Sequence, residues 1–214
     1  MKIILDHTGK RFNTEWIFRD LDYTFEKGTA IAILGRNGSG KSTLLQVISG
    51  NLHPTEGTVR YYHPEREVSN HRIFRHLAIV APYQELIEEF TLEEMVRFHF
   101  SFKKLVPGIA LEDASKMLGF RAAGRKPIRL FSSGMKQRVK LLLAFLSDVP
   151  LLLLDEPTMN LDRPGVEWYL KLVGDFRDDR TLIICSNLQQ QETAFCTGQI
   201  LVEDFKPAKK KEQG

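Results

Sequence analysis

Residues 35–43 form a glycine-rich segment with the pattern G-x-x-x-x-G-K-S/T. An apolar run, residues 30–34, precedes it, and residues 44–48 continue after it with apolar residues at helical spacing. In this context of strand, loop and helix, backbone N–H groups of the loop and the positive end of the helix both attract phosphate. The residues expected to bind a nucleotide here are Gly35, Asn37, Gly38, Ser39, Gly40, Lys41, Ser42 and Thr43.

Two side chains of this segment have specific expected roles. Lys41 is expected to reach the β- and γ-phosphates, and the hydroxyl of Ser42 to ligate Mg²⁺. The alternative is a glycine-rich turn without a ligand. It is disfavoured because the four fixed positions seldom coincide by chance between a strand and a helix. The pattern alone does not distinguish among phosphate-loop proteins.

A pair of acidic residues, Asp155 and Glu156, directly follows four leucines. In open α/β sheets, ligands bind at the carboxyl ends of such buried strands. A buried acidic pair is costly unless a cation meets it, so we expect Asp155 to hold Mg²⁺ through water beside Ser42. Glu156 is then free to orient or deprotonate a water that attacks the γ-phosphate. In the alternative interpretation, the pair caps a helix that begins near Pro157.

The elements that must position these residues alternate between strand and helix. The patterns predict strands at 2–6, 17–25, 30–34, 58–62, 77–81, 150–154, 181–185 and 200–202. They predict helices at 91–102, opened by a capping box, and at 111–118, 135–146, 167–176 and 189–195, besides the one after the glycine loop. The alternation implies an α/β fold with a mainly parallel sheet and helices on both faces.

The chain is expected to form one domain. Residues 1–84 and 148–205 would make the nucleotide-binding core, and 85–147, helical in periodicity throughout, an inserted helical subdomain. The basic tail, 206–214, is expected to be a solvated end; a lipid or nucleic-acid contact is the alternative. The two cysteines, Cys185 and Cys196, suggest neither a disulfide framework nor a metal site, and Cys185 is expected to be a small buried hydrophobic residue.

Composition limits the classes of partner. With 30 basic and 27 acidic residues, the net charge of +3 is too balanced to favour nucleic acid. No signal peptide and no apolar run near 18 residues is found, so we expect a cytoplasmic protein. If the chain serves a membrane, another protein must cross it.

Together these motifs resemble the nucleotide-binding subunit of an ABC transporter, and the resemblance covers essentially the whole chain. Residues 35–43 resemble its Walker A motif, 151–156 its Walker B motif with the catalytic glutamate, and Met159 to Asp162 its D-loop. The resemblance implies a P-loop NTPase (RecA-like) core, a small antiparallel β-subdomain and an inserted α-helical subdomain.

Two further residues gain expected roles from the resemblance. Gln84, after the strand that ends at Ala81, is similar to the Q-loop glutamine, which touches Mg²⁺ and senses the membrane partner. Phe12, 23 positions before Gly35, falls where the family places the aromatic residue that stacks on adenine, with Trp16 as the second candidate. The residues alone leave Phe12 open, because an aromatic side chain in a short polar loop can also cap the core.

The segment 130–138 resembles the LSGGQ signature of the family, with Ser133 in place of the first glycine and Met135 in place of the glutamine. Ser132 and Gly134, at the phosphate-facing positions, match. Independently of the family, a serine at the start of a helix offers a second anion site. One chain needs only one phosphate loop, so the second site is expected to close on ATP bound by another copy. An ordinary capped helix is the alternative.

One residue departs from the family pattern, because Asn187 stands where the resemblance places the switch histidine. Asparagine can donate a hydrogen bond to the γ-phosphate but cannot carry charge or a proton, so we expect slow hydrolysis. The signature variant is similar to that of haem-exporter and some drug-efflux ATPases, which favours export.

The resemblance therefore implies that the chain is the ATP-binding and hydrolysing subunit of an ABC transporter, a dimeric ATPase that uses ATP and Mg²⁺. Its expected partners are a separate membrane permease and a second copy or a homologous ATPase subunit, with no nucleic acid, at the inner face of the cell membrane. Candidate docking residues are Leu86, Ile87, Phe90, Phe98 and Phe100, which can alternatively fill the subdomain core. The alternatives are a soluble ABC-type ATPase acting on ribosomes or nucleic acid, a weakly hydrolysing regulatory subunit and, least favoured, a P-loop kinase.

Overall fold

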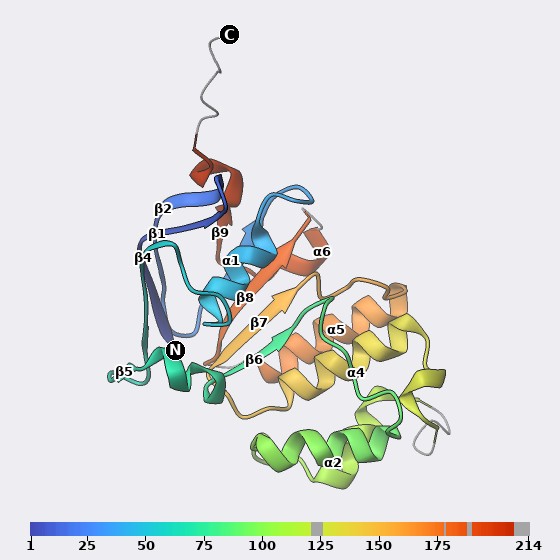
Figure 1. Cartoon of the computed structure of the whole chain (residues 1–214). Helices are drawn as coiled ribbons and strands as arrows, with labels where there is room; N and C mark the ends of the chain where they lie inside the picture. Colours follow the sequence, from blue (N-terminus) through green and yellow to red (C-terminus); the bar gives the residue numbers. More distant parts are fainter. Residues whose placement is uncertain (121–125, 178, 188–189, 208–214) are drawn as a thin grey trace.

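The computed structural model describes residues 1–120, 126–177, 179–187 and 190–207, which form two sheets and the helices around them (Figure 1). The larger sheet has five strands, and all of its neighbouring pairs are parallel. Its order is β6 (Leu77–Val80), β7 (Leu151–Asp155), β8 (Thr181–Ser186), β3 (Ala30–Leu34) and β9 (Gly198–Leu201). This confirms the predicted parallel sheet.

The smaller sheet is antiparallel and packs beside the first. Its order is β2 (Glu15–Phe25), β1 (Lys2–Phe12), β4 (Glu56–Tyr62) and β5 (Glu67–Val68). It shares one hydrophobic core with helix α1 (Lys41–Ile48) and one face of the parallel sheet. The family expectation of a small antiparallel β part is therefore confirmed.

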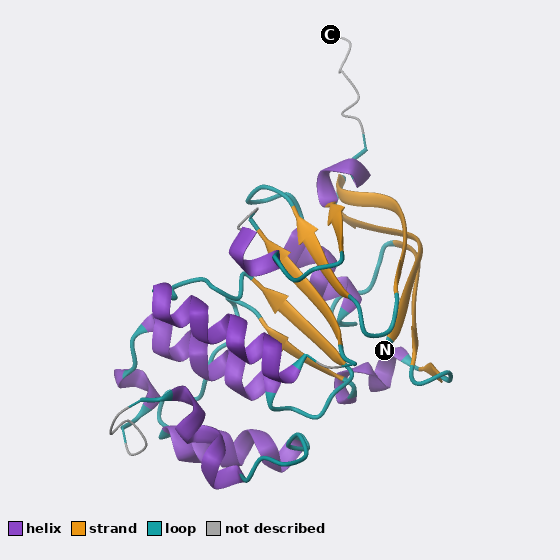
Figure 2. Cartoon of the chain, turned by 180° about the vertical axis from the view of Figure 1, so that it is seen from behind, coloured by secondary structure: helices purple, strands orange, loops and turns teal. Residues whose placement is uncertain are grey.

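The parallel strands are apolar on both faces because both faces are covered (Figures 1 and 2). Leu151 and Leu153 face the core that contains α1, whereas Leu152 and Leu154 face a second core. The second core contains α4 (Ser133–Phe145) and α5 (Arg163–Phe176). Since side chains alternate along a strand, Asp155 belongs to the same face as Leu151 and Leu153, toward α1.

The segment between β6 and β7 carries helices α2 (Leu92–Phe102), α3 (Leu111–Ala114) and α4, with 3₁₀ turns at Ser115–Leu118 and Ile128–Leu130. The predicted capping box of Thr91 and Glu94 at the start of α2 is confirmed. As predicted, one helix ends at 102 and the next begins at 111, so residues 103–110 carry no helix. This stretch is a connection tied to the end of α4 by bonds from Val106 N to Leu146 O and from Asp148 N to Lys104 O. Apolar residues of α2 and α3 join the core under the sheet, so the proposed subdomain boundaries stay a prediction.

Several element ends differ from the predictions. β1 continues to Phe12, and Phe12 pairs with Glu15 in a hairpin, so the expected polar loop is strand. The sequence hides this because the hairpin tip is exposed on both faces, which removes the alternation. Helix α5 begins four residues early, at Arg163, because Asp162 caps it by accepting from Gly165 N at 2.9 Å and Pro164 fits its first turn.

The C-terminal part and two short elements complete the fold. Residues 200–202 were expected to be strand, but β9 ends at Leu201 and a 3₁₀ turn, Val202–Phe205, follows. Helix α6 (Gln190–Thr193) is shorter than predicted, and position 189 and the end of the basic tail, 208–214, lie outside the described residues. β5 and a 3₁₀ helix at Asn70–Arg75 had no clear sequence signal. Of the helices within the described residues, none is long and apolar enough to cross a bilayer.

Candidate functional site

The carboxyl ends of β3, β7 and β8 bring the predicted phosphate and metal residues together. A cavity of about 350 Å³ opens there between the glycine loop and Glu156. Its lining residues are Ile17, Asn37, Gly38, Ser39, Gly40, Lys41, Ser42, Thr43 and Glu156. The sequence prediction missed Ile17, which carries no chemical signal and is placed here only by the docking of β2 beside the loop.

The glycine loop leaves the start of α1 open to an anion. Gly40 occupies the N-cap with φ 110°, and a Cβ there would lie 2.3 Å from Cγ2 of Ile17. No described side chain caps this helix, and its first turn contains no acidic residue. The helix start therefore presents free N–H groups and a positive dipole end to the cavity, which suits a phosphate group.

The side chain of Lys41 is held between the loop and Asn187. Its Nζ donates to Gly35 O at 2.8 Å, Arg36 O at 3.1 Å and Asn187 Oδ1 at 2.5 Å. The same amide of Asn187 donates from Nδ2 to Glu156 Oε1 at 2.6 Å. Asn187 thus connects the expected phosphate ligand Lys41 to the expected catalytic carboxylate Glu156 (the Lys41–Asn187–Glu156 network).

The backbone at Glu156 is strained. Its φ of 48° lies in the left-handed region, which non-glycine residues seldom adopt. Its N–H donates to Cys185 O at 2.9 Å, so β8 holds the residue in this conformation. Such strain is common at functional sites, where contacts with the surrounding structure maintain the strained conformation.

Asp155 has the properties of a cation ligand. It is 1% exposed, and neither of its carboxylate oxygens has a hydrogen-bond partner among the described residues. Burial is the main cause that raises the pKa of Asp155; nearby Glu156 and Glu192 raise it further, while Ser42 and Lys41 oppose the rise. A buried carboxylate beside other negative charges is costly without a counter-charge, so this side chain fits Mg²⁺. The alternative cap interpretation is wrong, because Asp155 ends β7 and Asp162 caps α5.

The predicted adenine and Q-loop residues lie outside this cavity. Gln84 folds back so that Oε1 accepts from Ala81 N at 3.2 Å. Phe12 is 46% exposed, with the ammonium of Lys10 5.2 Å from its ring centre. The ring of Trp16 contacts two guanidinium groups, of Arg11 at 5.2 Å and of Arg19 at 4.7 Å. The roles of Gln84, Phe12 and Trp16 stay predictions.

The signature segment is also apart from the cavity of its own chain. Ser132 caps α4 by accepting from Met135 N at 3.2 Å, and both Ser132 and Ser133 are exposed. Gly134 approaches the loop after β7 so closely that a Cβ would lie 2.6 Å from Asn160 O. The exposed start of α4 is thus available to a ligand held elsewhere, as its expected closure on ATP bound by another copy requires.

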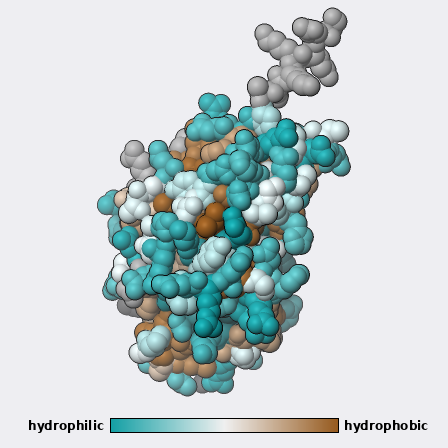
Figure 3. Space-filling view, turned by 90° about the vertical axis from the view of Figure 1, so that its left-hand side faces the viewer, coloured by the Kyte–Doolittle hydropathy of each residue, from teal (hydrophilic) through white to brown (hydrophobic). Residues whose placement is uncertain are grey.

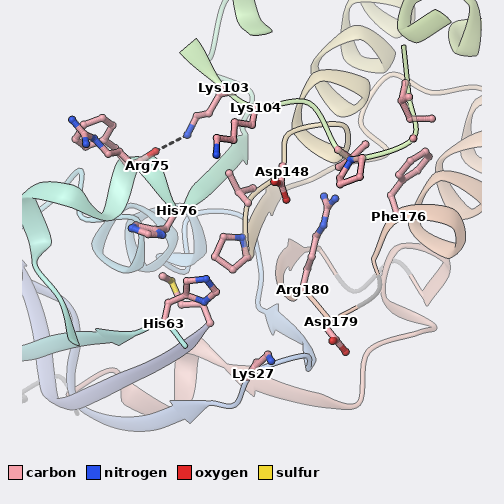
Figure 4. A pocket seen from close by; sticks show the side chains of 18 of the residues that line it. Lys27, His63, Arg75, His76, Lys103, Lys104, Asp148, Phe176, Asp179 and Arg180 are labelled. Carbon is pink, nitrogen blue, oxygen red and sulfur yellow. Dashed lines mark hydrogen bonds between the residues drawn. The ribbon is translucent and has the colours of Figure 1, made fainter. Parts of the chain in front are cut away.

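A larger cavity, about 1400 Å³, lies at the opposite edge of the sheet, before β6, β7 and β8 (Figure 4). Its wall mixes positive and negative side chains, among them Lys104, Asp148 and Asp179. Lys103 Nζ there donates to Phe74 O at 2.6 Å and Leu77 O at 2.8 Å, and Arg180 Nη1 donates to Phe145 O at 2.7 Å. None of the predicted motif residues is among the described residues that line it. This cavity is therefore separate from the phosphate site.

Comparison with known proteins agrees with this geometry. The family model described as ABC transporter matches residues 18–159, more than half of the chain. The ABC transporter ATP-binding protein YybJ of Bacillus subtilis is 28% identical over 190 residues, 87% of this chain and 86% of the relative. The cytochrome c biogenesis ATP-binding export protein CcmA of Agrobacterium fabrum is 29% identical over 178 residues, 81% of this chain and 82% of the relative.

Solved structures show the same fold. A putative ABC transporter ATP-binding protein from Pyrococcus furiosus superposes with a TM-score of 0.81 at 19% identity, over 97% of this chain and all of that one. MJ0796, a bacterial ABC transporter cassette solved as a dimer, superposes with a TM-score of 0.78 at 22% identity, over 94% of this chain and 95% of that one. From the family match, the fold and the phosphate site together, the chain belongs to the ABC transporter family.

Proposed function

We propose that this chain is the ATP-binding and hydrolysing subunit of an ABC transporter. The observation that carries the proposal is the Lys41–Asn187–Glu156 network beside the phosphate cavity. In this network the ammonium of Lys41, which would bind the phosphates, and the carboxylate of Glu156, which would act on the attacking water, belong to one hydrogen-bonded group, and this supports the proposal. The relatives that are ATP-binding proteins of transporters support the same function and do not favour a ribosomal or nucleic-acid ATPase.

Mg²⁺ would be held by Ser42 and Asp155, with Gln84 as the further predicted ligand. The unpartnered, buried oxygens of Asp155 support this assignment. When bound, the ion would neutralise charge on the transferred phosphoryl group. Glu156 would orient the attacking water or accept its proton, and Lys41 would hold the β- and γ-phosphates.

A second copy would complete the nucleotide site. Ser132, Ser133 and Gly134 lie at the exposed start of α4, and Gly134 lies against Asn160, two residues before Asp162, which caps α5. A head-to-tail pair would bring this edge of one copy to the ATP held by Lys41 of the other. The similar cassette MJ0796 was solved as a dimer, which supports this arrangement.

A separate permease would carry the substrate across the membrane, with this chain at its inner face. Of the docking candidates, Leu86, Ile87, Phe90 and Phe100 are packed against the core, while Phe98 is 41% exposed. Phe98 also contacts Phe102, whose side chain is 76% exposed, with ring centres 5.2 Å apart. Figure 3 shows apolar residues gathered at the end of the molecule that carries α2. We therefore assign the permease contact to Phe98 and Phe102. Export stays a prediction, supported by the likeness to CcmA.

ATP-driven pairing tests the proposal. Glu156→Gln should stop hydrolysis while ATP stays bound, so light scattering with saturating MgATP should show twice the mass of one 24.6 kDa chain. Adding Lys41→Ala, which removes the phosphate ligand, should return the variant to a monomer. Adding Ser132→Arg instead should block pairing yet leave binding of a fluorescent ATP analogue unchanged. A Glu156→Gln chain that remains monomeric with ATP bound would contradict the proposed pairing.

A further inference from the structure

The buried carboxylate of Glu192 lies outside the lining of the phosphate cavity, although it helps to raise the pKa of Asp155. Its residue is 2% exposed and belongs to α6, next to the end of β8 (Figure 1). The carboxylate accepts hydrogen bonds from two segments. Oε1 accepts from Thr158 N at 3.0 Å and also from Thr158 Oγ1, and Oε2 accepts from Ser186 Oγ.

These contacts join the two segments that carry Glu156 and Asn187. Thr158 lies two residues after Glu156, and Ser186 directly precedes Asn187. Because side chains alternate along β8, Ser186 belongs with Leu182 and Ile184 on the face opposite α1, whereas Asn187 continues toward α1. Glu192 therefore joins the two segments on one face of the sheet, while the Asn187–Glu156 bond of 2.6 Å joins them on the other.

The segment of Thr158 is held from a second side as well. The buried Gln137 of α4 donates from Nε2 to Pro157 O at 2.9 Å. Glu156 is thus followed by two residues whose positions are set by hydrogen bonds from α4 and to α6. An apolar side chain could fill the space at position 192 without a carboxylate. Burying a carboxylate costs free energy unless hydrogen-bond donors surround it, as they do here.

We propose that Glu192 is a positioning residue for ATP hydrolysis, which fixes the segment of Glu156 relative to the segment of Asn187. The inference rests on the proposed roles of Glu156 and Asn187. Glu192 is not among the described residues that line the phosphate cavity. It therefore acts through the two segments that it joins. Its loss should slow the chemical step and leave the phosphate loop able to bind ATP.

The expected result is a lower kcat with little change in ATP affinity. Glu192→Ala should lower kcat at least about tenfold, since a displacement of roughly 1 Å in a reacting group can cost about 100-fold. The Kd for ATP should change less than about threefold, because Lys41 and the loop keep their contacts. Glu192→Gln should recover most of kcat, because its amide oxygen can accept from Thr158 and its NH₂ can donate to Ser186 Oγ.

The two donors supply independent variants. Ser186→Ala and Thr158→Val each remove one hydroxyl that donates to Glu192, at nearly constant volume for Thr158. Each should lower kcat, and neither should lower it further when combined with Glu192→Ala, since the three residues act as one unit. Active chains are counted by ATP-binding stoichiometry, so that a loss of folded protein is not read as a loss of kcat.

The outcomes separate this inference from the proposed function. Wild-type kcat in Glu192→Ala would overturn the inference, as would a loss of activity that only parallels the loss of ATP-binding chains. If Glu192→Ala does not fold, wild-type kcat in both Ser186→Ala and Thr158→Val would overturn it. Glu156→Gln is assayed in parallel, and its full activity would instead refute the proposed role of Glu156.

Discussion

The two edges of the parallel sheet differ in how their polar groups are satisfied. At the carboxyl edge, Asp155 keeps two buried oxygens without partners among the described residues, and Glu156 adopts a strained φ of 48°. At the amino edge, Lys103 and Arg180 donate to backbone carbonyls. The amino edge has the larger cavity, about 1400 Å³ against about 350 Å³.

The comparison shows that cavity size is a poor guide to the chemical site in this protein. Groups that are buried, charged and unpartnered cost free energy, so a fold keeps them where a ligand can compensate. Charged groups whose N–H donors already bind backbone carbonyls have fewer donors available to a ligand. The smaller cavity is therefore the better candidate for the functional site. Three experiments can test this difference between the two edges of the sheet.

The largest expected effect separates the two edges directly. Asp155→Ala should lower the steady-state rate of ATP hydrolysis on the order of 100-fold or more, because it removes the carboxylate proposed to hold Mg²⁺. Lys104→Ala, a matched removal of a charge from the wall of the large cavity, should leave the rate unchanged. A rate for Asp155→Ala within threefold of wild type, or an equal loss in both variants, would remove the distinction between the edges.

An intermediate effect is expected at the centre of the carboxyl edge. Asn187→His should raise kcat about three- to tenfold, because an imidazole can take up charge or a proton beside the γ-phosphate and an amide cannot. Asn187→Leu, which removes the bonds to both Lys41 and Glu156, should lower kcat instead. The measurement is steady-state ATPase with MgATP saturating. An unchanged or lower rate for Asn187→His would contradict the expectation that Asn187 slows hydrolysis.

The smallest effect concerns stability near the amino edge. Burial is the main cause that lowers the pKa of His99 to about 4, with nearby Lys103 adding to the shift, and its neutral Nε2 lies 2.9 Å from Ser147 Oγ. The unfolded chain, with a histidine pKa near 6.5, binds this proton first as pH falls. The low pKa of His99 therefore makes the free energy of unfolding fall as the pH drops from about 6.5 to 4, by about 2 kcal/mol at pH 4.5.

Urea unfolding at pH 7 and pH 4.5 checks this expectation. His99→Gln keeps a donor for Ser147 but does not titrate, so its free energy of unfolding should fall less than that of wild type over this pH range. The difference between the two chains isolates His99 from the other groups that titrate there. An equal fall in both chains would show that the buried imidazole does not cause acid lability.

The candidate site residues had a clearer sequence signal than the residues around them. The glycine loop, Asp155 and Glu156 were readable because their chemistry requires particular residue types at short spacing. Alternation of strand and helix also predicted the parallel sheet correctly. Phe12 was placed in a loop wrongly, since a hairpin exposed on both faces lacks the alternation that signals a strand.

Long-range contacts had no readable signal. Ile17 lines the phosphate cavity because β2 docks beside the loop, and Glu192 is buried because Thr158 and Ser186 surround its carboxylate. In the sequence, Glu192 is one polar residue in a polar stretch. Local spacing cannot distinguish such a side chain from a solvated one.

Local chemistry thus specified which groups can bind phosphate and a divalent cation, because a turn of glycines and a strand ending in carboxylates are properties of neighbouring residues. Tertiary packing decided which of these groups meet. Asn187 lies 146 positions from Lys41 and 31 from Glu156, and only the pairing of β3, β7 and β8 brings the three within hydrogen-bond distance. The physical reason is that burial, strain and unpartnered oxygens arise from contacts between distant segments, which no short pattern contains.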